Sequence, residues 1–382
     1  MKRICMILAL VIAASLLPLQ AGAVELEVNG KSALLMDVQT GTVLYESNPH
    51  ERLAPASVTK IMTMLLIMEA VDSGKIAMED MVTASETAAS KGGSQIYLKV
   101  GETMSVSDML KSIAVSSAND CACAMAEHIA GSEGAFVDLM NNRAKELGMN
   151  DTNFVNCTGL DDSPEAENHR TSAHDIALMS RELLKNHPKI KEFTTIWMDT
   201  VRNGAFGLSN TNKMIRFYSG ATGLKTGFTS GAGYCLSATA QREGLELIAV
   251  VMGCETSRER TAACKAMLDY GFANFAVVSP DLTESNTLVP VKLGKETRIA
   301  AQLGADTGML IDKAKKSTVT TEVTLEESVT APVEQGQKLG TMTVKAGEEI
   351  LAQIPLVAGE PVERLTWGDL FVKCLRRAAM AG

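Results

Sequence analysis

Between residues 24 and 275, the chain alternates between two rhythms of apolar residues. A helical rhythm, with apolar residues three and four positions apart, predicts helices over residues 57–70, 106–117, 120–129, 134–147, 172–184 and 258–274. Shorter strand-like runs lie near both ends of this region, at residues 32–38, 232–240 and 245–252. Because strands bracket the helices, we expect an α+β domain whose sheet is completed late in the chain.

The pattern changes after residue 275. Apolar side chains recur with a period of two in residues 318–325 and again in residues 350–356, which is typical of strands. Glycines separate the short segments around them. We therefore predict a small all-β domain over residues 276–360, after a catalytic domain over residues 24–275.

The last segment, residues 361–382, carries a third pattern. Its apolar residues recur at helical spacing, at Trp367, Leu370, Phe371, Cys374, Leu375 and Ala378. The segment is short, and its basic residues fall mostly on the other faces, so we predict an amphipathic helix that lies on a membrane surface. A helix packed against the protein's own surface would show the same pattern.

The first 23 residues have the pattern of an export signal. Lys2 and Arg3 precede an apolar run over residues 4–17, and Ala21-Gly22-Ala23 offers a small-residue cleavage site. A retained membrane helix is the alternative, but the run is too short to span a bilayer comfortably. We therefore expect residues 1–23 to be removed and the mature protein to work outside the cytoplasm, on the outer face of the cytoplasmic membrane.

Net charge narrows the choice of partners. Without Lys2 and Arg3, the formal net charge falls from −9 to −11. Binding to a phosphate backbone needs clustered Lys and Arg. A nucleic-acid partner is therefore not expected.

The cysteines do not indicate a framework of disulfides. Removal of Cys5 from the eight cysteines leaves seven, and an odd number cannot all pair within the chain. Cys121-Ala122-Cys123, with His128 nearby, lacks the Cys-x2-Cys spacing and the second ligand pair of a zinc site. We expect these cysteines to be small buried residues and predict no metal.

Candidate chemistry begins with a Ser-x-x-Lys string. Residues three apart share a helix face, so Ser57 and Lys60 can meet if Ser57 opens the helix that Pro55 prepares. A neutral lysine amine can take a serine proton, and both burial and a like charge such as Lys225 would lower its pKa. Alone, the string is more often an exposed helix face, but the apolar residues that follow indicate a buried helix.

Ser117 and Asn119 form a second candidate element. They follow a predicted helix, and a turn there could aim both side chains into a cleft. Ser117 is then a candidate proton relay, and Asn119 is a candidate contact for a substrate amide. The alternative is that Asn119 merely caps the next helix.

Lys225-Thr226-Gly227 is the third element. A cation beside a hydroxyl suits a substrate carboxylate, and Gly227 permits a ligand to approach the backbone along a strand edge. The backbone N–H groups of Ser57 and Phe228 are candidate oxyanion donors. A lone Lys-Thr-Gly string is more often an exposed turn, and the Phe228 side chain could serve packing alone.

These strings together resemble a known family, the low-molecular-mass penicillin-binding proteins that act as serine-type D-Ala-D-Ala carboxypeptidases. The resemblance rests on Pro55-Ala56-Ser57-Val58-Thr59-Lys60, Ser117-Ala118-Asn119-Asp120, Gly223-Leu224-Lys225-Thr226-Gly227 and Ala232-Gly233-Tyr234. It covers nearly everything after the export signal, including Ala331-Pro332-Val333 of the predicted β domain. It implies a penicillin-binding/β-lactamase-like transpeptidase fold, with a helical region and an antiparallel sheet.

The resemblance also assigns roles to individual residues. It implies that Ser57 is the nucleophile and that Lys60 is its base. Ser117 and Asn119 would form the second element, and Lys225 and Thr226 would bind the carboxylate. Arg260 resembles a family arginine near the same carboxylate, although Arg258 lies close to it in sequence. Phe228 departs from the small polar residue or histidine that many relatives carry there, which affects fine substrate preference but not the backbone contact.

The implied substrate is a peptidoglycan stem pentapeptide. Ser57 would attack the bond between its two terminal D-alanines, and β-lactams would inhibit the enzyme by acylating the same serine. This chemistry needs no cofactor. Two alternatives are open: a β-lactamase, although no Glu-x-x-Leu-Asn string follows Ser117, and a non-catalytic envelope-binding protein with a vestigial site.

Overall fold

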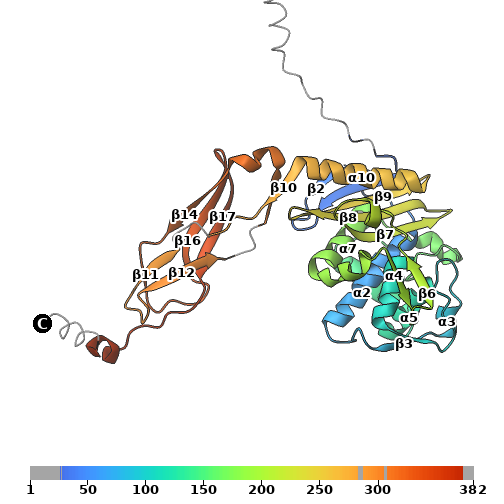
Figure 1. Ribbon diagram of the computed structural model, residues 1–382, viewed down its shortest axis with the longest axis horizontal. Coiled ribbons are helices and arrows are strands. Elements are labelled where there is room, and N and C mark those ends of the chain that lie inside the picture. The colour runs from blue at the N-terminus through green and yellow to red at the C-terminus, as the bar shows by residue number, and fades with distance from the viewer. Residues whose placement is uncertain (1–25, 27, 283–286, 305–307, 373–382) are drawn as a thin grey trace, which may run out of the picture.

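The computed structural model describes residue 26 and residues 28–282, 287–304 and 308–372, and these residues form two bodies (Figure 1). The larger body has helices around a five-stranded sheet, and the smaller body is built from strands. The predicted export signal and residues 373–382 of the predicted amphipathic helix lie outside the described residues.

An antiparallel sheet with strand order β2-β1-β9-β8-β7 organises the larger body. The early strand β1 pairs with the late strand β9, so Leu34 lies opposite Val250. The strands are β1 (Ser32–Asp37), β2 (Val43–Ser47), β7 (Ala221–Thr229), β8 (Gly233–Arg242) and β9 (Leu245–Cys254). The sheet is therefore completed late, as predicted, and β7 forms one of its edges.

Six of the helices are those that the apolar rhythm predicts, with ends that differ by at most three residues. They are α2 (Lys60–Asp72), α4 (Val106–Ser116), α5 (Asn119–Ala130), α6 (Glu133–Glu146), α7 (Ala173–Asn186) and α10 (Ser257–Asn274). Shorter elements escape that rhythm because they offer too few positions. They are α3 (Glu86–Ala89), α8 (Lys191–Thr194), α9 (Met214–Phe217), the 3₁₀ turns η1 (Ala56–Thr59), η2 (Pro164–Asn168) and η3 (Pro188–Ile190), and the two-stranded sheets of β3 (Met81–Thr83) with β4 (Thr103–Ser105) and of β5 (Met198–Val201) with β6 (Phe206–Ser209).

Helices cover both faces of this sheet (Figure 1). On one face, Leu35 and Leu247 pack in one cluster with Leu268 of α10. On the other face lies the main core, which includes every apolar residue of α2 between residues 61 and 68. A helix that is apolar all round belongs inside a protein, and α2 is accordingly the central helix of this body.

The smaller body contains a six-stranded sheet with the order β14-β16-β17-β12-β11-β15. Its core includes Val289, Leu339, Met342 and Leu356. The strands are β11 (Leu288–Lys292), β12 (Arg298–Leu303), β14 (Val319–Leu325), β15 (Val329–Thr330), β16 (Lys338–Ala346) and β17 (Glu349–Ala358). The predicted small all-β body is therefore present.

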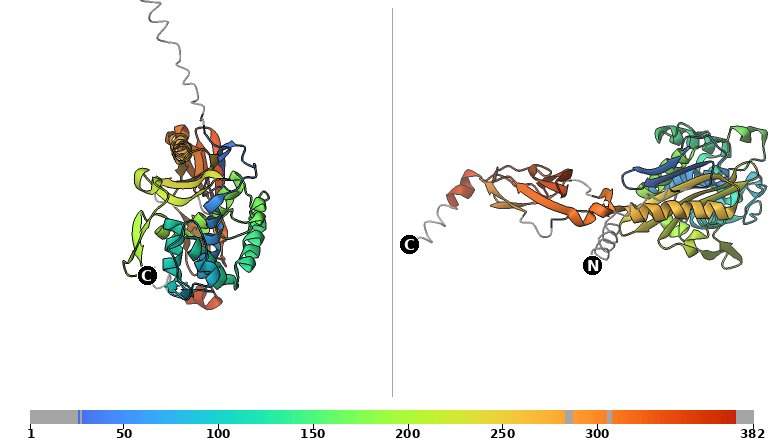
Figure 2. Two further views of the ribbon diagram at one scale, coloured as in Figure 1. Left: turned by 90° about the vertical axis from the view of Figure 1, so that its right-hand side faces the viewer. Right: turned by 90° about the horizontal axis from the view of Figure 1, so that it is seen from above.

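A short two-stranded sheet connects the two bodies. The chain leaves α10 directly into β10 (Phe275–Val278), which pairs with β13 (Met309–Asp312) of the smaller body (Figure 2). The 3₁₀ turn η4 (Lys313–Thr318) follows β13, and the Nζ atom of Lys313 donates a hydrogen bond to the Phe272 carbonyl oxygen at 2.8 Å. The junction therefore combines strand pairing with a side-chain contact to the end of α10.

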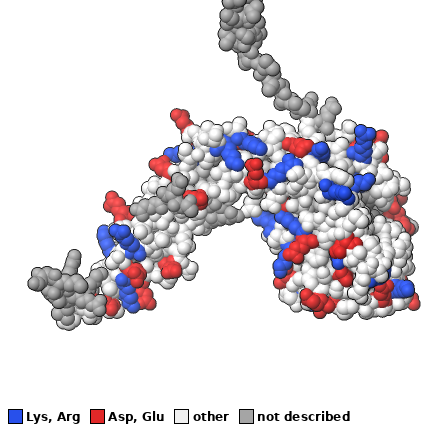
Figure 3. Space-filling model, viewed as in Figure 1, with Lys and Arg blue, Asp and Glu red and all other residues white. Residues whose placement is uncertain are grey.

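A helix begins at residue 367, at the far end of the smaller body (Figure 2). Its first residue, Trp367, is 89% exposed, and Phe371 is 67% exposed. Among the described residues, no helix is long and apolar enough to cross a membrane. On the face in Figure 3, acidic and basic side chains are interspersed over both bodies.

Candidate active site

Ser57 and Lys60 meet where a 3₁₀ turn becomes a helix. Ser57 lies in η1, and Lys60 is the first residue of α2. Lys60 Nζ and Ser57 Oγ are joined by a hydrogen bond of 3.0 Å. The predicted contact is therefore present, and Ser57 is only partly buried, so a ligand can reach its hydroxyl.

The Lys60 side chain is completely buried. Burial lowers the pKa of its amine to about 7, although Cys157 and Asp120 act to raise it. The Nζ atom also donates a hydrogen bond to the Thr158 carbonyl oxygen at 2.7 Å. Near neutral pH, a large share of the Lys60 amines is therefore uncharged and able to accept a proton.

Lys225 lies in β7 and is also buried. Burial, followed by the charges of Lys60 and Arg260, holds the pKa of Lys225 well below its usual value. The sequence predicts that burial and the charge of Lys225 both lower the pKa of Lys60. Burial does so in the structure, whereas the charge effect is that of Lys60 on the pKa of Lys225. A ligand carboxylate beside Lys225 would favour its charged form.

Ser117 and Asn119 lie at the turn between α4 and α5. Ser117 ends α4 in the left-handed conformation, with φ of 63°. The turn is tied to β7 through Thr211, whose N–H donates to the Val115 carbonyl and whose Oγ1 accepts a hydrogen bond from Thr226 Oγ1 at 2.7 Å. The second and third elements are therefore neighbours.

Asn119 does not cap α5 with its side chain. Its Nδ2 atom instead donates to the Gly92 carbonyl oxygen at 2.7 Å, and its backbone N–H donates to the Ser94 carbonyl oxygen at 2.7 Å. Its Oδ1 atom is buried without a hydrogen-bond partner among the described residues. The capping alternative is thus wrong, and an acceptor is left for the N–H of a ligand amide.

The edge strand β7 lies directly against η1. A Cβ atom on Gly227 would come within 2.7 Å of the Pro55 carbonyl oxygen and 3.0 Å of the Ser57 backbone nitrogen. Only glycine permits this approach, which brings the N–H groups of Ser57 and Phe228 into one small region. The Phe228 side chain is 53% exposed and stacks on Tyr234 at 4.2 Å between ring centroids.

Arg260, rather than the exposed Arg258, lies behind β7. Its Nη1 atom donates to the carbonyl oxygens of Gly227, at 3.1 Å, and Cys235, at 3.3 Å. The guanidinium also lies 5.4 Å from the centre of the Tyr234 ring. Arg260 therefore fixes the backbone beside Lys225 and adds positive charge there.

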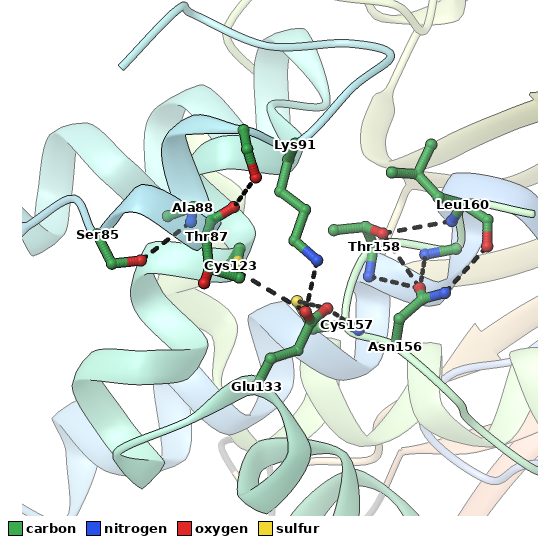
Figure 4. A network of polar contacts seen from close by, with 12 residues as sticks. Ser85, Thr87, Ala88, Lys91, Cys123, Glu133, Asn156, Cys157, Thr158 and Leu160 are labelled. Atoms are coloured by element: carbon green, nitrogen blue, oxygen red, sulfur yellow. Dashed lines mark hydrogen bonds and ion pairs between the residues drawn. The ribbon is translucent and has the colours of Figure 1, made fainter. Parts of the chain in front are cut away.

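Motif matching misses the turn at residues 156–160, whose Thr158 carbonyl oxygen accepts a hydrogen bond from Lys60 Nζ. Figure 4 shows the hydrogen bonds within this turn. Asn156 Oδ1 accepts hydrogen bonds from the N–H groups of Thr158, at 3.1 Å, and Gly159, at 2.7 Å. Gly159 has a φ of 81°, and a Cβ atom there would lie 1.8 Å from the Ala56 carbonyl oxygen. The Asn-x-x-Gly pattern of this turn is the signal that could have revealed it.

His169 is a second residue that motif matching misses. Its Nδ1 atom accepts a hydrogen bond from the Val155 N–H, which leaves the proton on Nε2 to be donated to Thr59 Oγ1 at 2.8 Å. Thr59 in turn donates to the Ala56 carbonyl oxygen. Burial, with the charges of Arg170 and Lys60, lowers the pKa of His169 to about 4, so this buried chain of hydrogen bonds supports η1 with a neutral ring.

Metal-binding side chains do not gather near Ser57 in the part of the chain that the structure describes. Glu69, Glu182 and His187 come close enough to hold an ion, but Arg143 already binds both glutamates, at 2.7 and 2.6 Å, and His187 contacts Asp72. The six cysteines among the described residues are free and buried, as expected for small core residues.

A serine hydroxyl that can lose its proton to a buried amine, beside an edge strand that can receive a peptide, is suited to acyl transfer through a serine ester. The fold and the site therefore define a serine acyl-transfer enzyme.

Comparison with protein families shows which family of this enzyme class the chain belongs to. The chain belongs to the D-alanyl-D-alanine carboxypeptidase family, whose model matches residues 19–256. Residues 278–364 match the C-terminal domain of penicillin-binding protein 5. These matches confirm the predicted family, the α+β fold with its small all-β domain, and the enzyme class of serine-type carboxypeptidase.

Individual relatives agree with the family. The D-alanyl-D-alanine carboxypeptidase DacF of Bacillus subtilis is 46% identical over 346 residues, which cover 89% of this chain and 87% of the relative. Penicillin-binding protein 5 from Haemophilus influenzae has a TM-score of 0.71 at 30% identity and covers 88% of this chain and 98% of its own. Ampicillin-bound penicillin-binding protein D2 from Listeria monocytogenes has a TM-score of 0.59 at 32% identity, over 65% of this chain and 99% of its own.

Proposed function

We propose that the protein removes the terminal D-alanine from peptidoglycan stem pentapeptides through an acyl-enzyme on Ser57. The observation that carries this proposal is the 3.0 Å contact between Ser57 Oγ and the Lys60 amine. Burial lowers the pKa of this amine to about 7. A base with a pKa near the working pH is well matched to proton transfer.

The proposed reaction has two halves. Neutral Lys60 takes the hydroxyl proton as Ser57 Oγ attacks the carbonyl carbon between the two D-alanines, and the N–H groups of Ser57 and Phe228 stabilise the oxyanion. The C–N bond then breaks, and Ser117 relays the proton from Lys60 to the amine of the departing D-alanine. Water hydrolyses the ester in the second half and restores Ser57.

Substrate contacts follow from the edge strand. The peptide lies along β7, where Gly227 leaves room for it beside η1. Lys225 and Thr226 bind the terminal carboxylate, supported by the positive charge of Arg260 behind them. The free Oδ1 atom of Asn119 accepts a hydrogen bond from a substrate amide.

Penicillins acylate the same serine in this proposal, because a β-lactam presents an amide carbonyl and a carboxylate at similar positions. The Listeria penicillin-binding protein D2 structures in ampicillin-bound and cefotaxime-bound forms support this point by similarity. The alternatives of a β-lactamase and of a non-catalytic envelope protein are distinguished by one experiment. The mature protein is incubated with a fluorescent penicillin and, separately, with a stem pentapeptide.

Each outcome has one meaning. Labelling at Ser57 together with release of D-alanine supports the carboxypeptidase. Rapid loss of intact penicillin without D-alanine release supports the β-lactamase, and absence of both from folded protein supports the non-catalytic alternative.

Export and membrane attachment belong to the same proposal. We propose that residues 1–23 are an export signal, that residues 24–275 and 276–360 are the two domains of the mature enzyme, and that residues 361–382 bind the outer face of the cytoplasmic membrane. The exposed Trp367 and Phe371 side chains support a surface-bound helix. Deletion of residues 363–382 should move the protein from the membrane fraction to the soluble fraction; an unchanged distribution would favour a helix packed on the protein itself.

A further inference from the structure

Glu133 lies at the centre of a polar network that none of the three motifs includes (Figure 4). It is the first residue of α6. Its Oε2 atom forms an ion pair with Lys91 Nζ at 2.5 Å, and its Oε1 atom accepts hydrogen bonds from the Cys157 backbone N–H, at 3.3 Å, and thiol, at 3.2 Å. One carboxylate therefore connects two loops that are far apart in the sequence.

The first of these loops holds Lys60. The Cys157 carbonyl oxygen accepts a hydrogen bond from Thr63 Oγ1 at 2.6 Å, and the next carbonyl oxygen, that of Thr158, accepts one from Lys60 Nζ at 2.7 Å. Lys60 and Thr63 are three residues apart on α2 and share a face. The peptide segment 157–158 is therefore held between α2 on one side and Glu133 on the other.

The second loop holds Asn119. Lys91 is followed by Gly92, whose carbonyl oxygen accepts the hydrogen bond from Asn119 Nδ2. A Cβ atom on Gly93 would lie 2.9 Å from the same Nδ2 atom, so the loop packs closely on this side chain. A shift of Lys91 would therefore move the carbonyl that orients Asn119.

Both members of the ion pair keep their charge near neutral pH. Burial acts to raise the pKa of Glu133, but the hydrogen bond and charge of Lys91 outweigh it and leave that pKa below its usual value. Burial likewise acts to lower the pKa of Lys91, and Glu133 outweighs it so that the pKa of Lys91 is raised. The side chains are only 21% and 18% exposed, so loss of either partner leaves a poorly hydrated charge.

We propose that Glu133, through its ion pair with Lys91, is a positioning residue of the active site. It fixes the loop that holds Lys60 and the loop that holds Asn119 in position relative to each other. This inference rests on the proposed function of Lys60 as the base. Glu133 touches no reacting atom; it acts through the Thr158 carbonyl on one side and the Gly92 carbonyl on the other.

The test measures the rate of acylation by a fluorescent penicillin as a function of pH. In Glu133→Gln we expect the maximal rate to fall about tenfold, because small displacements of catalytic groups are costly. We also expect the midpoint of the pH profile to move to lower pH. An ammonium donates a stronger hydrogen bond to the Thr158 carbonyl than an amine does, so loosening that carbonyl lowers the pKa of Lys60.

Glu182→Gln is the matched control. Glu182 is 20% exposed, against 18% for Glu133, and it also forms an ion pair, with Arg143 at 2.6 Å, but it contacts neither loop. We expect both variants to lose some thermal stability, and only Glu133→Gln to change the acylation rate and its pH midpoint. An unchanged midpoint in Glu133→Gln would overturn the proposal, whatever the change in maximal rate.

Lys91→Met provides an independent measurement if Glu133→Gln does not fold, and the double variant provides a further one if both single variants fold. Lys91→Met should lower the rate in the same way, and the double variant should be no slower than the slower single variant, because both changes break one connection. Losses that multiply would contradict the proposal. Wild-type protein that acquires no label would instead contradict the function on which the proposal rests.

Discussion

The β7 edge of the larger body and the core of the smaller body differ in what they bury. Near β7, the side chains of Lys60, Lys225 and Arg260 are all buried. Among the described residues from 287 to 372, by contrast, no polar or charged side chain is buried. Charges in the smaller body lie at the surface, as in the exposed pair of Lys345 with Glu322.

This difference indicates where the molecule does chemistry. A buried charge costs stability unless it is paired, and burial is what lowers the pKa of Lys60 to about 7. An apolar core with exposed ion pairs has no such cost and no such reactivity. The larger body therefore carries the reactive groups and the smaller body carries none of them, a difference that variants of each body can test.

The largest expected effect comes from removal of the base. Lys60→Met should keep the fold and lower the rate of acylation by penicillin at least about 10³-fold, because no neutral amine remains to take the Ser57 proton. Lys75→Met is the control, since Lys75 also donates to a backbone carbonyl oxygen, that of Ile129 at 3.0 Å. Normal labelling in Lys60→Met would exclude Lys60 as the base.

Much of the fold and of the candidate site could be predicted from the sequence, and some of it could not. The helices α2, α4, α5, α6, α7 and α10 follow from apolar spacing, and short strings mark Ser57, Lys60 and Lys225. The Asn-x-x-Gly pattern could have revealed the turn that contains Thr158, but the roles of Thr158 and Glu133 cannot be predicted, because a backbone carbonyl and a single carboxylate have no sequence pattern. Their effect depends on distant segments, residues 91–93 and 156–160, that meet only in the folded chain.

The pairing of β10 with β13 was also beyond the sequence patterns. Strands of four residues contain too few positions to show a period of two. In the smaller body only β14 and β17 are predicted, and the nine-residue β16 is missed as well. The effect of Lys225 on the pKa of Lys60 does not follow from the sequence either, because the sequence does not show how deeply each amine is buried or which other charges lie near it.

The next effect tests the close approach of β7 to η1. Gly227→Ala places a Cβ atom 2.7 Å from the Pro55 carbonyl oxygen, so the edge strand must move away from Ser57. We expect acylation to slow about 10²-fold, since displaced donors stabilise the oxyanion poorly. In Gly207→Ala of β6, the new Cβ atom meets nothing within 4 Å, and the rate should not change. Equal rates in the two variants would refute the close-approach argument.

The pH dependence of wild-type acylation gives a smaller effect. Because the pKa of Lys60 is lowered to about 7, the neutral fraction is nearly complete above that pH and falls about tenfold for each pH unit below it. The acylation rate should therefore decline on the acid side of pH 7 and level off above it. A decline that begins only near the usual lysine pKa would show that Lys60 is not held neutral by burial.

The smallest effect on acylation is expected in the smaller body. Leu356→Ala removes a completely buried side chain from its core and should cost about 2–5 kcal/mol of unfolding free energy. Ile350→Ala, in the same strand but 55% exposed, should cost much less. Acylation by folded protein should stay within about twofold of wild type in both variants. A large loss of acylation in Leu356→Ala would show that the two bodies are not independent in function.

The central claim is that Ser57 forms an acyl-enzyme while D-alanine is released. Mass spectrometry of the protein after brief incubation with penicillin, followed by digestion, locates the adduct, and an assay for free D-alanine with a stem pentapeptide measures turnover. We predict an adduct on the peptide that contains Ser57, release of D-alanine by wild type, and neither result for Ser57→Ala. An adduct on another residue, or D-alanine release by Ser57→Ala, would contradict the account.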